Sequence, residues 1–457
     1  MRFSSINPAT GTLLRTYPAW TETQLESMLA TLPGVAENYS ATAIPQRAAW
    51  LQDAARLLRR DREALARLIT CEMGKLVGEA RAEIDKCALA CEFFAAQGGR
   101  FLAEETMATE AARSYVAYEP LGTVLAIMPW NFPFWQVFRA AAPLLLAGNT
   151  VLLKHAPNVT GCALAVEQLF HEAGWPAGTF QTLPVTLDQT PRLLADPRIH
   201  GVRFTGSLPA GREVAKLAGA NIKKTVLELG GSDPFIVLED ADLESAAAQA
   251  AASRFVNGGQ SCIAAKRFIV VDAIADEFVE RFRALARALR PGDPLDESTT
   301  LPPLARADLR DTLHRQVAAS ISLGAVAVAG CAPVAGPGNF YQASLLDRVR
   351  PGMAAFDEEV FGPVAAVVRV RDEAEAVKLA NHSRYGLGGS VWTADSGRGE
   401  RIARRLHCGM SFVNAMVKSD PRLPCGGVKD SGYGRELAAH GIREFTNVKT
   451  VWIVGSA

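Results

Sequence analysis

From residue 122 onward, the sequence alternates short β-rich runs with helical segments, and this alternation restricts the possible folds more than any other feature. The first runs are "GTVLAIMPW", "NTVLLKH", "GVRFTGS" and "KKTVLEL". Strands that alternate with crossover helices form a parallel sheet with helices on its faces. The pattern therefore predicts a doubly wound nucleotide-binding unit between residues 122 and 233.

A second alternation follows the first. Its β-rich runs are "PFIVLED", "KRFIVV", "AVAVAG", "PVAAVVRV" and "GMSFVN", with helices expected near residues 242–255 and 274–289. Proline and glycine mark residues 290–305 and 330–340 as loops. This half of the chain is predicted to form a second α/β domain.

The flanking segments have different patterns. From residue 45 to about Thr109, apolar residues recur at three and four positions, which predicts two long amphipathic helices. The segments "SYVAYEPLG" and "NVKTVWIV" are predicted to be strands with few polar residues, and such strands need a partner sheet to cover them. We expect a homodimer or homotetramer to supply it.

Composition narrows the possible partners. The 457 residues include 48 Lys plus Arg and 48 Asp plus Glu, so no basic excess indicates nucleic acid or an anionic membrane. No secretory signal or run of about 18 apolar residues is visible, and we expect a cytoplasmic protein that acts on small molecules. The 8 cysteines show no CxxC pair or metal-ligand spacing, so the default expectation is a reduced, metal-free chain.

Cys262, in "NGGQSCIAAKRFIVV", is the first candidate for chemistry. A lone cysteine is most often a small buried hydrophobe. Here two glycines and a serine precede it and allow a ligand to approach the backbone. A cysteine on such a turn presents its sulfur and its own N–H to one atom, which suits a nucleophile.

Two further polar residues suit the same chemistry. Glu228 ends a β-rich run before Gly230 and Gly231, and is either a solvated or salt-bridged glutamate at a strand end or a general base. Asn131 lies in a proline-bounded turn, where it either serves turn chemistry or donates its amide to an oxyanion opposite the Cys262 N–H.

Two segments suit a nucleotide. Gly206 and Ser207 precede a helix expected to begin near Pro209, and a helix N-terminus binds anions. The signal is weak alone because the three-glycine dinucleotide fingerprint is absent. Lys154 ends a strand and is either a solvated charge or a ligand for ribose hydroxyls.

The motifs also occur together in a fixed order: "PWNFP", "KHAP", "FTGS", "LELGG", "GQSC", "EEVFGP" and "PCGGVKDSGYGRE". In this respect the chain resembles the NAD(P)-dependent aldehyde dehydrogenase superfamily, from "INPATG" to "VKTVWI". The resemblance implies an α/β fold with a Rossmann-type cofactor domain, a second α/β catalytic domain and a small β oligomerisation element. The expected bounds are residues 1–113 and 123–229 for the cofactor domain, 230–426 for the catalytic domain, 114–122 and 442–457 for the oligomerisation strands, and 427–441 for a connecting segment.

The resemblance also implies roles. Cys262 is the nucleophile, Glu228 the base, and Asn131 an oxyanion donor together with the Cys262 N–H. Thiolate attack on an aldehyde, hydride transfer to the nicotinamide and hydrolysis of the thioester then follow. Because Glu228 is present, hydrolysis is favoured over transfer to coenzyme A. The residues expected to hold NADP, NAD or both are Trp130, Lys154, Pro157, Gly206, Ser207, Leu229, Glu359 and Phe361.

Closer matching, through "KHAPNV" and "VKSDPRLP", favours the succinate-semialdehyde dehydrogenase branch. A distal carboxylate needs a fixed cation, and Arg139 is the candidate, the alternative being an arginine at a helix surface or subunit contact. Ser419 is a second candidate for binding the carboxylate. Some semialdehyde enzymes have a second arginine just before the cysteine loop, and this chain has Val256 at that position. A broad-specificity enzyme for aliphatic or aromatic aldehydes is the alternative function, and a non-catalytic protein on this scaffold the remote one.

Two departures from the family bear on the ligands. A glutamate that accepts a ribose hydroxyl bond in many members is Pro157 here, which removes the electrostatic bar to the 2′-phosphate of NADP. Cys425 replaces an aromatic residue and is expected to line the substrate funnel near Cys262. It either widens the funnel or forms a disulfide with Cys262 under oxidation.

Overall fold

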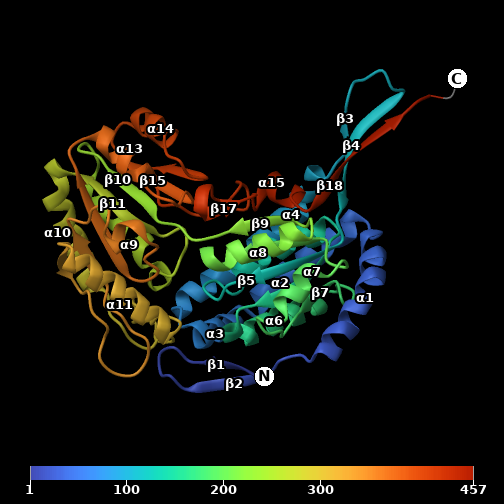
Figure 1. Cartoon of the computed structure of the whole chain (residues 1–457), viewed down its shortest axis with the longest axis horizontal. Helices are drawn as coiled ribbons and strands as arrows, with labels where there is room; N and C mark the ends of the chain where they lie inside the picture. The colour runs from blue at the N-terminus through green and yellow to red at the C-terminus, as the bar shows by residue number, and fades with distance from the viewer. Residues whose placement is uncertain (1, 456–457) are drawn as a thin grey trace.

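The computed structural model describes residues 2–455. Two large sheets with helices on their faces form the body, and a small β arm projects from it (Figure 1). Two N-terminal strands, β1 (Arg2–Ile6) and β2 (Leu13–Pro18), form a separate antiparallel hairpin. Within the described residues, no helix is both long and apolar enough to cross a membrane.

The first sheet has six strands in the order β17-β9-β8-β5-β6-β7. Their bounds are β5 (Thr123–Met128), β6 (Thr150–His155), β7 (Phe180–Thr182), β8 (Gly201–Thr205), β9 (Lys224–Glu228) and β17 (Gly432–Tyr433). All are parallel except β17, which pairs antiparallel with β9. The chain runs outward from β5 to β7, then returns to β8 on the other side of β5. That reversal opens a crevice at the carboxyl ends of β5 and β8.

Every residue of β5 and β6 is buried, as their near-continuous apolar sequences require. The covering helices are α5 (Trp135–Leu146), α6 (Thr160–Glu172), α7 (Thr190–Ala195) and α8 (Leu208–Ala220), with a short 3₁₀ turn η1 (Pro157–Val159) before α6. The predicted doubly wound unit is confirmed, including a helix that begins next to Pro209.

The expectation of two long N-terminal helices was too simple. Three helices occur in that segment, α2 (Ile44–Arg60), α3 (Arg62–Met73) and α4 (Val77–Phe101), and α1 (Glu22–Ser40) precedes them. A capping box of Thr21 and Gln24 begins α1. Gly74, with a φ of 88°, ends α3, because only glycine adopts this backbone conformation without strain.

The second sheet has seven strands in the order β12-β13-β14-β11-β10-β15-β16, with only β12 antiparallel. Their bounds are β10 (Asp233–Val237), β11 (Ala265–Val271), β12 (Val326–Ala329), β13 (Ser344–Asp347), β14 (Val364–Val370), β15 (Gly388–Trp392) and β16 (Met410–Val413). The sequence patterns predicted five of these but neither β13 nor β15. Glycines weaken the strand signal of β15, which begins "GG".

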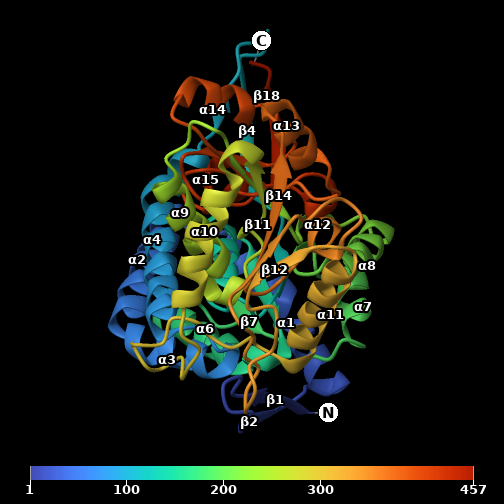
Figure 2. The ribbon, with the colours of Figure 1, turned by 90° about the vertical axis from the view of Figure 1, so that its left-hand side faces the viewer.

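Helices cover both faces of this sheet. Figure 2 shows α9 (Leu243–Phe255) and α10 (Asp272–Ala288) on one side of β11 and β14. On the other side lie α11 (Ala307–Ser322), α12 (Ala354–Asp357) and α13 (Glu373–Asn381), and α14 (Ser396–Ala403) packs against β15 and β16. A distorted 3₁₀ turn, η2 (Val256–Gly259), leads from α9 toward Cys262.

The arm consists of β3 (Glu105–Thr106), β4 (Arg113–Pro120) and β18 (Thr446–Ile453) (Figure 1). The two segments expected to need a partner sheet pair with each other, from Thr446↔Pro120 to Ile453↔Arg113. Two short elements, η3 (Lys429–Ser431) and α15 (Ala438–Arg443), flank β17 and lead to β18. Val448 and Trp452 are 60% and 46% exposed, so this small sheet still has an uncovered apolar surface.

Candidate active site

A cavity of about 340 Å³ lies at the carboxyl edge of the six-stranded sheet. Parallel strands bring the residues that follow them to one edge, so Asn131 after β5 and Ser207 after β8 meet Glu228 at the end of β9. The lining includes all of the expected cofactor residues other than Lys154 and Pro157, namely Trp130, Gly206, Ser207, Leu229, Glu359 and Phe361. Trp130 and Phe361 meet edge to face, with ring centroids 5.9 Å apart. We call this space the edge cavity.

A second cavity of about 210 Å³ opens between α4, α5 and the cysteine loop. Its lining contains charged side chains from α4 and α5 together with Ser419. Gln136 and Cys262 line both cavities. Cys262 therefore stands where the edge cavity meets this second space, which we call the helix cavity.

The loop before Cys262 has an unusual backbone. Asn257, Gly258 and Gly259 all have positive φ, at 54°, 60° and 74°. Asparagine tolerates this conformation better than most residues, and glycine has no steric penalty there. A Cβ on Gly259 would collide with the carbonyl of Gly362. The glycines of the sequence motif thus serve the loop geometry.

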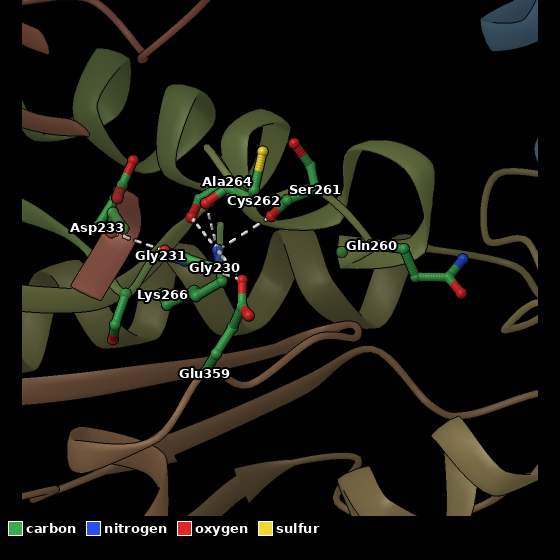
Figure 3. A network of polar contacts seen from close by, with 12 residues as sticks. Gly230, Gly231, Asp233, Gln260, Ser261, Cys262, Ala264, Lys266 and Glu359 are labelled. Carbon is green, nitrogen blue, oxygen red and sulfur yellow. Dashed lines mark hydrogen bonds and ion pairs between the residues drawn. The ribbon is translucent and has the colours of Figure 1, made fainter. Parts of the chain in front are cut away.

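A buried lysine holds the loop from below. The Lys266 ammonium donates to the carbonyl oxygens of Ser261, Cys262 and Ala264 at 3.0, 2.8 and 3.1 Å (Figure 3). Its Nζ also lies 3.9 Å from a carboxylate oxygen of Glu359. Lys266 is 1% exposed, so its charged group contacts the backbone carbonyls of the loop rather than solvent and holds the loop in place.

Two N–H donors face the same region. The Asn131 side chain donates one hydrogen bond, to the Gln260 carbonyl at 3.1 Å, and its amide has a second hydrogen. The backbone N–H of Cys262 donates no hydrogen bond to any of residues 2–455. Both donors are therefore available to an oxyanion that forms next to the sulfur.

The two reactive groups have shifted pKa values. Burial raises the pKa of the Cys262 thiol to about 11, against the opposing charges of Arg139 and Lys266, so the thiol is protonated at neutral pH. Burial also raises the pKa of Glu228, while Arg139 and Arg203 lower it. One oxygen of Glu228 has no hydrogen-bond partner within the described part of the chain. A carboxylate of this kind can accept a proton at neutral pH.

Lys154 and Pro157 line a separate small cavity at the carboxyl end of β6, close to Thr160 and Thr182. Lys154 is 6% exposed and forms no ion pair or side-chain hydrogen bond with residues 2–455, and burial lowers its pKa. At the start of α8, Ser207 makes no side-chain cap, which leaves backbone N–H groups for an anion. An unpaired buried amine and an uncapped helix end both fit a nucleotide with hydroxyl and phosphate oxygens.

The expected substrate residues are placed differently from one another. Arg139 lines the helix cavity, but its Nε lies 2.5 Å from Glu436, whose other oxygen pairs with Arg203. Ser419 also lines this cavity. Cys425 lines neither cavity, contrary to expectation, because its backbone pairs with Glu436 and holds the 1% exposed thiol in the core.

The Cys425 thiol, Glu228 and Glu436 place potential metal-ligand atoms within 4.8 Å of one another. However, Arg139 and Arg203 already pair with Glu436, which makes this cluster a poor cation site.

Several lining residues were not anticipated from the sequence, among them Lys86, Gln136 and Arg306. Lys86 reaches the helix cavity from α4, Gln136 lines both cavities, and Arg306 lies 5.9 Å from the Trp130 ring centroid. Lys86 donates a hydrogen bond to the Ser419 hydroxyl at 2.8 Å across 333 positions of sequence. A lysine within an amphipathic helix carries no local signal of such a contact.

The comparisons with known proteins agree with this geometry. The sequence model of the aldehyde dehydrogenase family matches residues 1–451. A probable succinate-semialdehyde dehydrogenase, NADP(+), of Synechocystis is 47% identical and covers 99% of this chain and 100% of its own. A succinate semialdehyde dehydrogenase, NAD(P)+, of Escherichia coli is 48% identical, covering 98% and 97%. The crystal structure of a succinic semialdehyde dehydrogenase from Streptococcus pyogenes with NADP+ superposes with a TM-score of 0.97 at 36% identity, covering 99% and 100%.

Proposed function

The chain belongs to the aldehyde dehydrogenase family, and from this premise we propose that it oxidises succinate semialdehyde to succinate with NADP⁺, and also accepts NAD⁺. The observation that carries the proposal is the position of Cys262 at the junction of the two cavities. One cavity fits a nicotinamide next to the sulfur, and the other fits a short aldehyde with charged groups at its far end.

In the proposed reaction, Cys262 loses its proton and its sulfur adds to the aldehyde carbon. Asn131 and the Cys262 N–H then stabilise the alkoxide of the thiohemiacetal. A nicotinamide bound in the edge cavity would supply the acceptor for the hydride lost from the thiohemiacetal carbon, and the alkoxide oxygen then becomes the carbonyl oxygen of a thioester. Glu228 takes a proton from the water that cleaves the resulting thioester and releases the acid.

We propose that the edge cavity and the cavity beside Lys154 together hold the cofactor. Lys154 binds ribose hydroxyls, the N-terminus of α8 binds the pyrophosphate, and Trp130, Leu229, Glu359 and Phe361 enclose the nicotinamide end. Pro157 leaves room for a 2′-phosphate. The named relatives that use NADP(+) or NAD(P)+ support this assignment. The unit built from residues 1–113 and 123–229 is the proposed cofactor domain, and residues 230–426 form the proposed catalytic domain.

The substrate is tested by steady-state kinetics. We expect kcat/KM for succinate semialdehyde to exceed that for butyraldehyde by about 10²-fold, because a charged hydrogen bond contributes about 1.5–3 kcal/mol. Both aldehydes are measured with NADP⁺ and with NAD⁺. Equal values for the two aldehydes would instead identify a broad-specificity enzyme, and no reaction with any aldehyde a non-catalytic protein.

The arm supports a further part of the proposal, that the protein forms a homodimer or homotetramer. Val448, Trp452 and Ile453 of β18 remain 60%, 46% and 42% exposed, and a neighbouring copy would cover them. We also place the protein in the cytoplasm, where a reducing environment suits its free cysteines. Size-exclusion chromatography with light scattering tests the assembly.

A further inference from the structure

The direction of the Cys262 N–H depends on the peptide group that this residue shares with Ser261. A trans peptide group is planar, and its C=O and N–H bonds point in opposite directions. No cis peptide bond occurs among the described residues. The contacts that fix the Ser261 carbonyl oxygen therefore also determine where the Cys262 N–H points.

Lys266 makes such a contact. Its Nζ donates to the Ser261 oxygen at 3.0 Å and to the carbonyl oxygens of Cys262 and Ala264 at 2.8 and 3.1 Å. A neutral amine has only two hydrogens, so three donated bonds require the ammonium form. Figure 3 shows the Cys262 sulfur pointing away from this lysine. The Cys262 N–H is likewise directed away from Lys266, because the carbonyl oxygen of the same peptide group is held toward it.

The charge of Lys266 is balanced by a carboxylate of the edge cavity. One oxygen of Glu359 lies 3.9 Å from the Lys266 Nζ and accepts a hydrogen bond from the Gly231 N–H at 3.0 Å. A Cβ at Gly230 would collide with the Glu359 carboxylate, and a Cβ at Gly231 would collide with the Cys262 carbonyl. The glycine pair thus allows a carboxylate and the nucleophile loop to share one ammonium.

The neighbouring buried arginines have other partners. Arg254 donates to the carbonyl oxygens of Gly259 and Ala265, on either side of the Ser261–Cys262 peptide group. Arg267 donates to three carbonyl oxygens outside the loop. Among the described residues, Lys266 is therefore the cation that contacts both this peptide group and Glu359.

We propose that Lys266 is a positioning residue for the oxyanion donor. By holding the Ser261 carbonyl, it aims the Cys262 N–H at the alkoxide that forms on the aldehyde carbon, while Glu359 compensates its charge. This inference deepens the proposed function and rests on it. Without Lys266 the peptide group is free to turn, and one of the two oxyanion donors is lost although Cys262 and Asn131 remain.

Two reactions of Cys262 separate this role from an effect of charge alone. Aldehyde oxidation forms an alkoxide and needs the oxyanion donors. Alkylation by iodoacetamide, in which the thiolate displaces iodide, forms no alkoxide and depends on ionisation of the thiol. Burial raises the pKa of this thiol, Glu359 and Glu228 add to the increase, and Arg139 and Lys266 oppose it. The two rates measured in one variant therefore isolate the contribution of the oxyanion donor.

Lys266→Met removes the charge and the three hydrogen bonds at a similar side-chain length. We expect alkylation of Cys262 at about pH 9 to slow by about 10-fold, because the loss of a nearby positive charge disfavours the thiolate. We expect kcat/KM to fall by about 10³-fold for both succinate semialdehyde and butyraldehyde, because a lost oxyanion donor contributes a further factor of about 10².

Mass spectrometry of peptides measures the alkylation of each cysteine in the intact enzyme. Cys71 is the reference within each variant, because the charged groups that act on it are Asp293, Glu72 and Arg67. Lys378→Met is the matched control, since it removes an exposed lysine of α13, and both rates should stay at the wild-type values.

Asn131→Ala calibrates the comparison because it removes the other proposed oxyanion donor. Aldehyde oxidation should fall by about 10²-fold to 10³-fold, while alkylation of Cys262 keeps the wild-type rate. Lys266→Met should combine this loss with the slower alkylation.

The outcomes distinguish this inference from the proposed function. If Lys266→Met lowers oxidation and alkylation by the same factor, the lysine acts through its charge alone and the inference is overturned. If Lys266→Met does not fold, Lys266→Ala, which leaves room for water beside the three carbonyls, gives the same comparison. An equal loss of kcat/KM for the two aldehydes, larger than the loss of alkylation, supports the role of Lys266 even if the wild-type enzyme shows no preference for succinate semialdehyde. A wild-type enzyme that oxidises no aldehyde overturns both proposals.

Discussion

The two cavities that meet at Cys262 are built from different kinds of structure. The edge cavity takes its lining mainly from turns that follow β5, β8 and β9, where short motifs such as "PWNFP" and "FTGS" place each residue. The helix cavity takes its lining from α4, α5 and a segment more than 300 positions away, which brings Lys86 to Ser419.

The charges differ as well. The edge cavity offers a ligand backbone N–H groups and the Asn131 amide, with single charged side chains such as Glu228 and Glu359 beside them, whereas buried ion pairs border the helix cavity. The difference shows that the reacting groups are positioned by local turns, whereas substrate choice depends on charged side chains that distant segments bring together.

The largest effect is expected at Cys262, the residue that unites the two cavities. Cys262→Ser should lower kcat by at least about 10³-fold, because the reaction needs a sulfur nucleophile. NADP⁺ affinity, measured by quenching of protein fluorescence, should remain close to wild type. Cys408→Ser changes another half-buried thiol and should retain activity. If Cys262→Ser keeps the wild-type rate, Cys262 is not the nucleophile.

The next effect separates structural charge from binding charge in the helix cavity. Glu436→Gln leaves Arg139 and Arg203 buried without their shared carboxylate, and the free energy of unfolding should fall by about 3–5 kcal/mol. Urea denaturation measures the change.

Glu400→Gln is the control for that experiment. It breaks an ion pair with Arg404 whose side chains are 63% and 77% exposed, and should change the free energy of unfolding by about 0–1 kcal/mol. Equal effects of the two variants would show that the buried ion pairs contribute no more to the free energy of unfolding than an exposed ion pair does.

The same contrast explains what the sequence predicts. Glu228 and Asn131 were identified because each lies at a strand end or turn, where a few neighbouring residues determine the backbone. The strands β5, β6, β8 and β9 were identified because buried parallel strands are almost continuously apolar.

What the sequence could not predict depends on remote packing. Gly388 and Gly389 weaken the strand pattern of β15, so the sequence did not predict this strand. No local pattern shows that the Cys425 side chain is buried in the core or that Glu436 forms an ion pair with Arg139. Lys86 resembles any solvated helical lysine until α4 packs against the segment that carries Ser419. Compensation of buried charges is a property of the folded chain and leaves no motif.

A smaller effect tests the cofactor side. Pro157→Glu should lower the ratio of kcat/KM for NADP⁺ to that for NAD⁺ by about 10²-fold, because a carboxylate repels the 2′-phosphate. Pro157 also begins η1, so Pro157→Gln, without the charge, separates repulsion from a change of backbone. If both variants lower the ratio equally, the effect is structural and Pro157 does not govern cofactor choice.

The smallest effect is a pH dependence confined to the helix cavity. Burial, aided by the charge of Arg139, lowers the pKa of Lys86 to about 8, whereas Glu83 and the thiols of Cys425 and Cys87 oppose this shift. Below this pH the lysine is charged and can bind a carboxylate; above it the charge is lost. Since kcat/KM reports groups of the free enzyme, the preference for succinate semialdehyde over butyraldehyde should decline by about 10-fold between about pH 7 and about pH 9.

Both aldehydes depend equally on ionisation of Cys262, whose pKa of about 11 makes the two absolute rates rise with pH, and their ratio removes that contribution. The remaining charged groups around the cavity are Lys75, Glu79, Glu83 and the Arg139–Glu436 pair, with Glu228 behind them, and burial raises the pKa of Glu79 and of Glu228. Ionisation of either carboxyl group would weaken carboxylate binding in the same direction, so Lys86→Arg is the deciding variant. Because a guanidinium stays charged throughout this range, Lys86→Arg should keep a constant ratio. A decline that persists in Lys86→Arg would assign the titration to Glu79 or Glu228 instead.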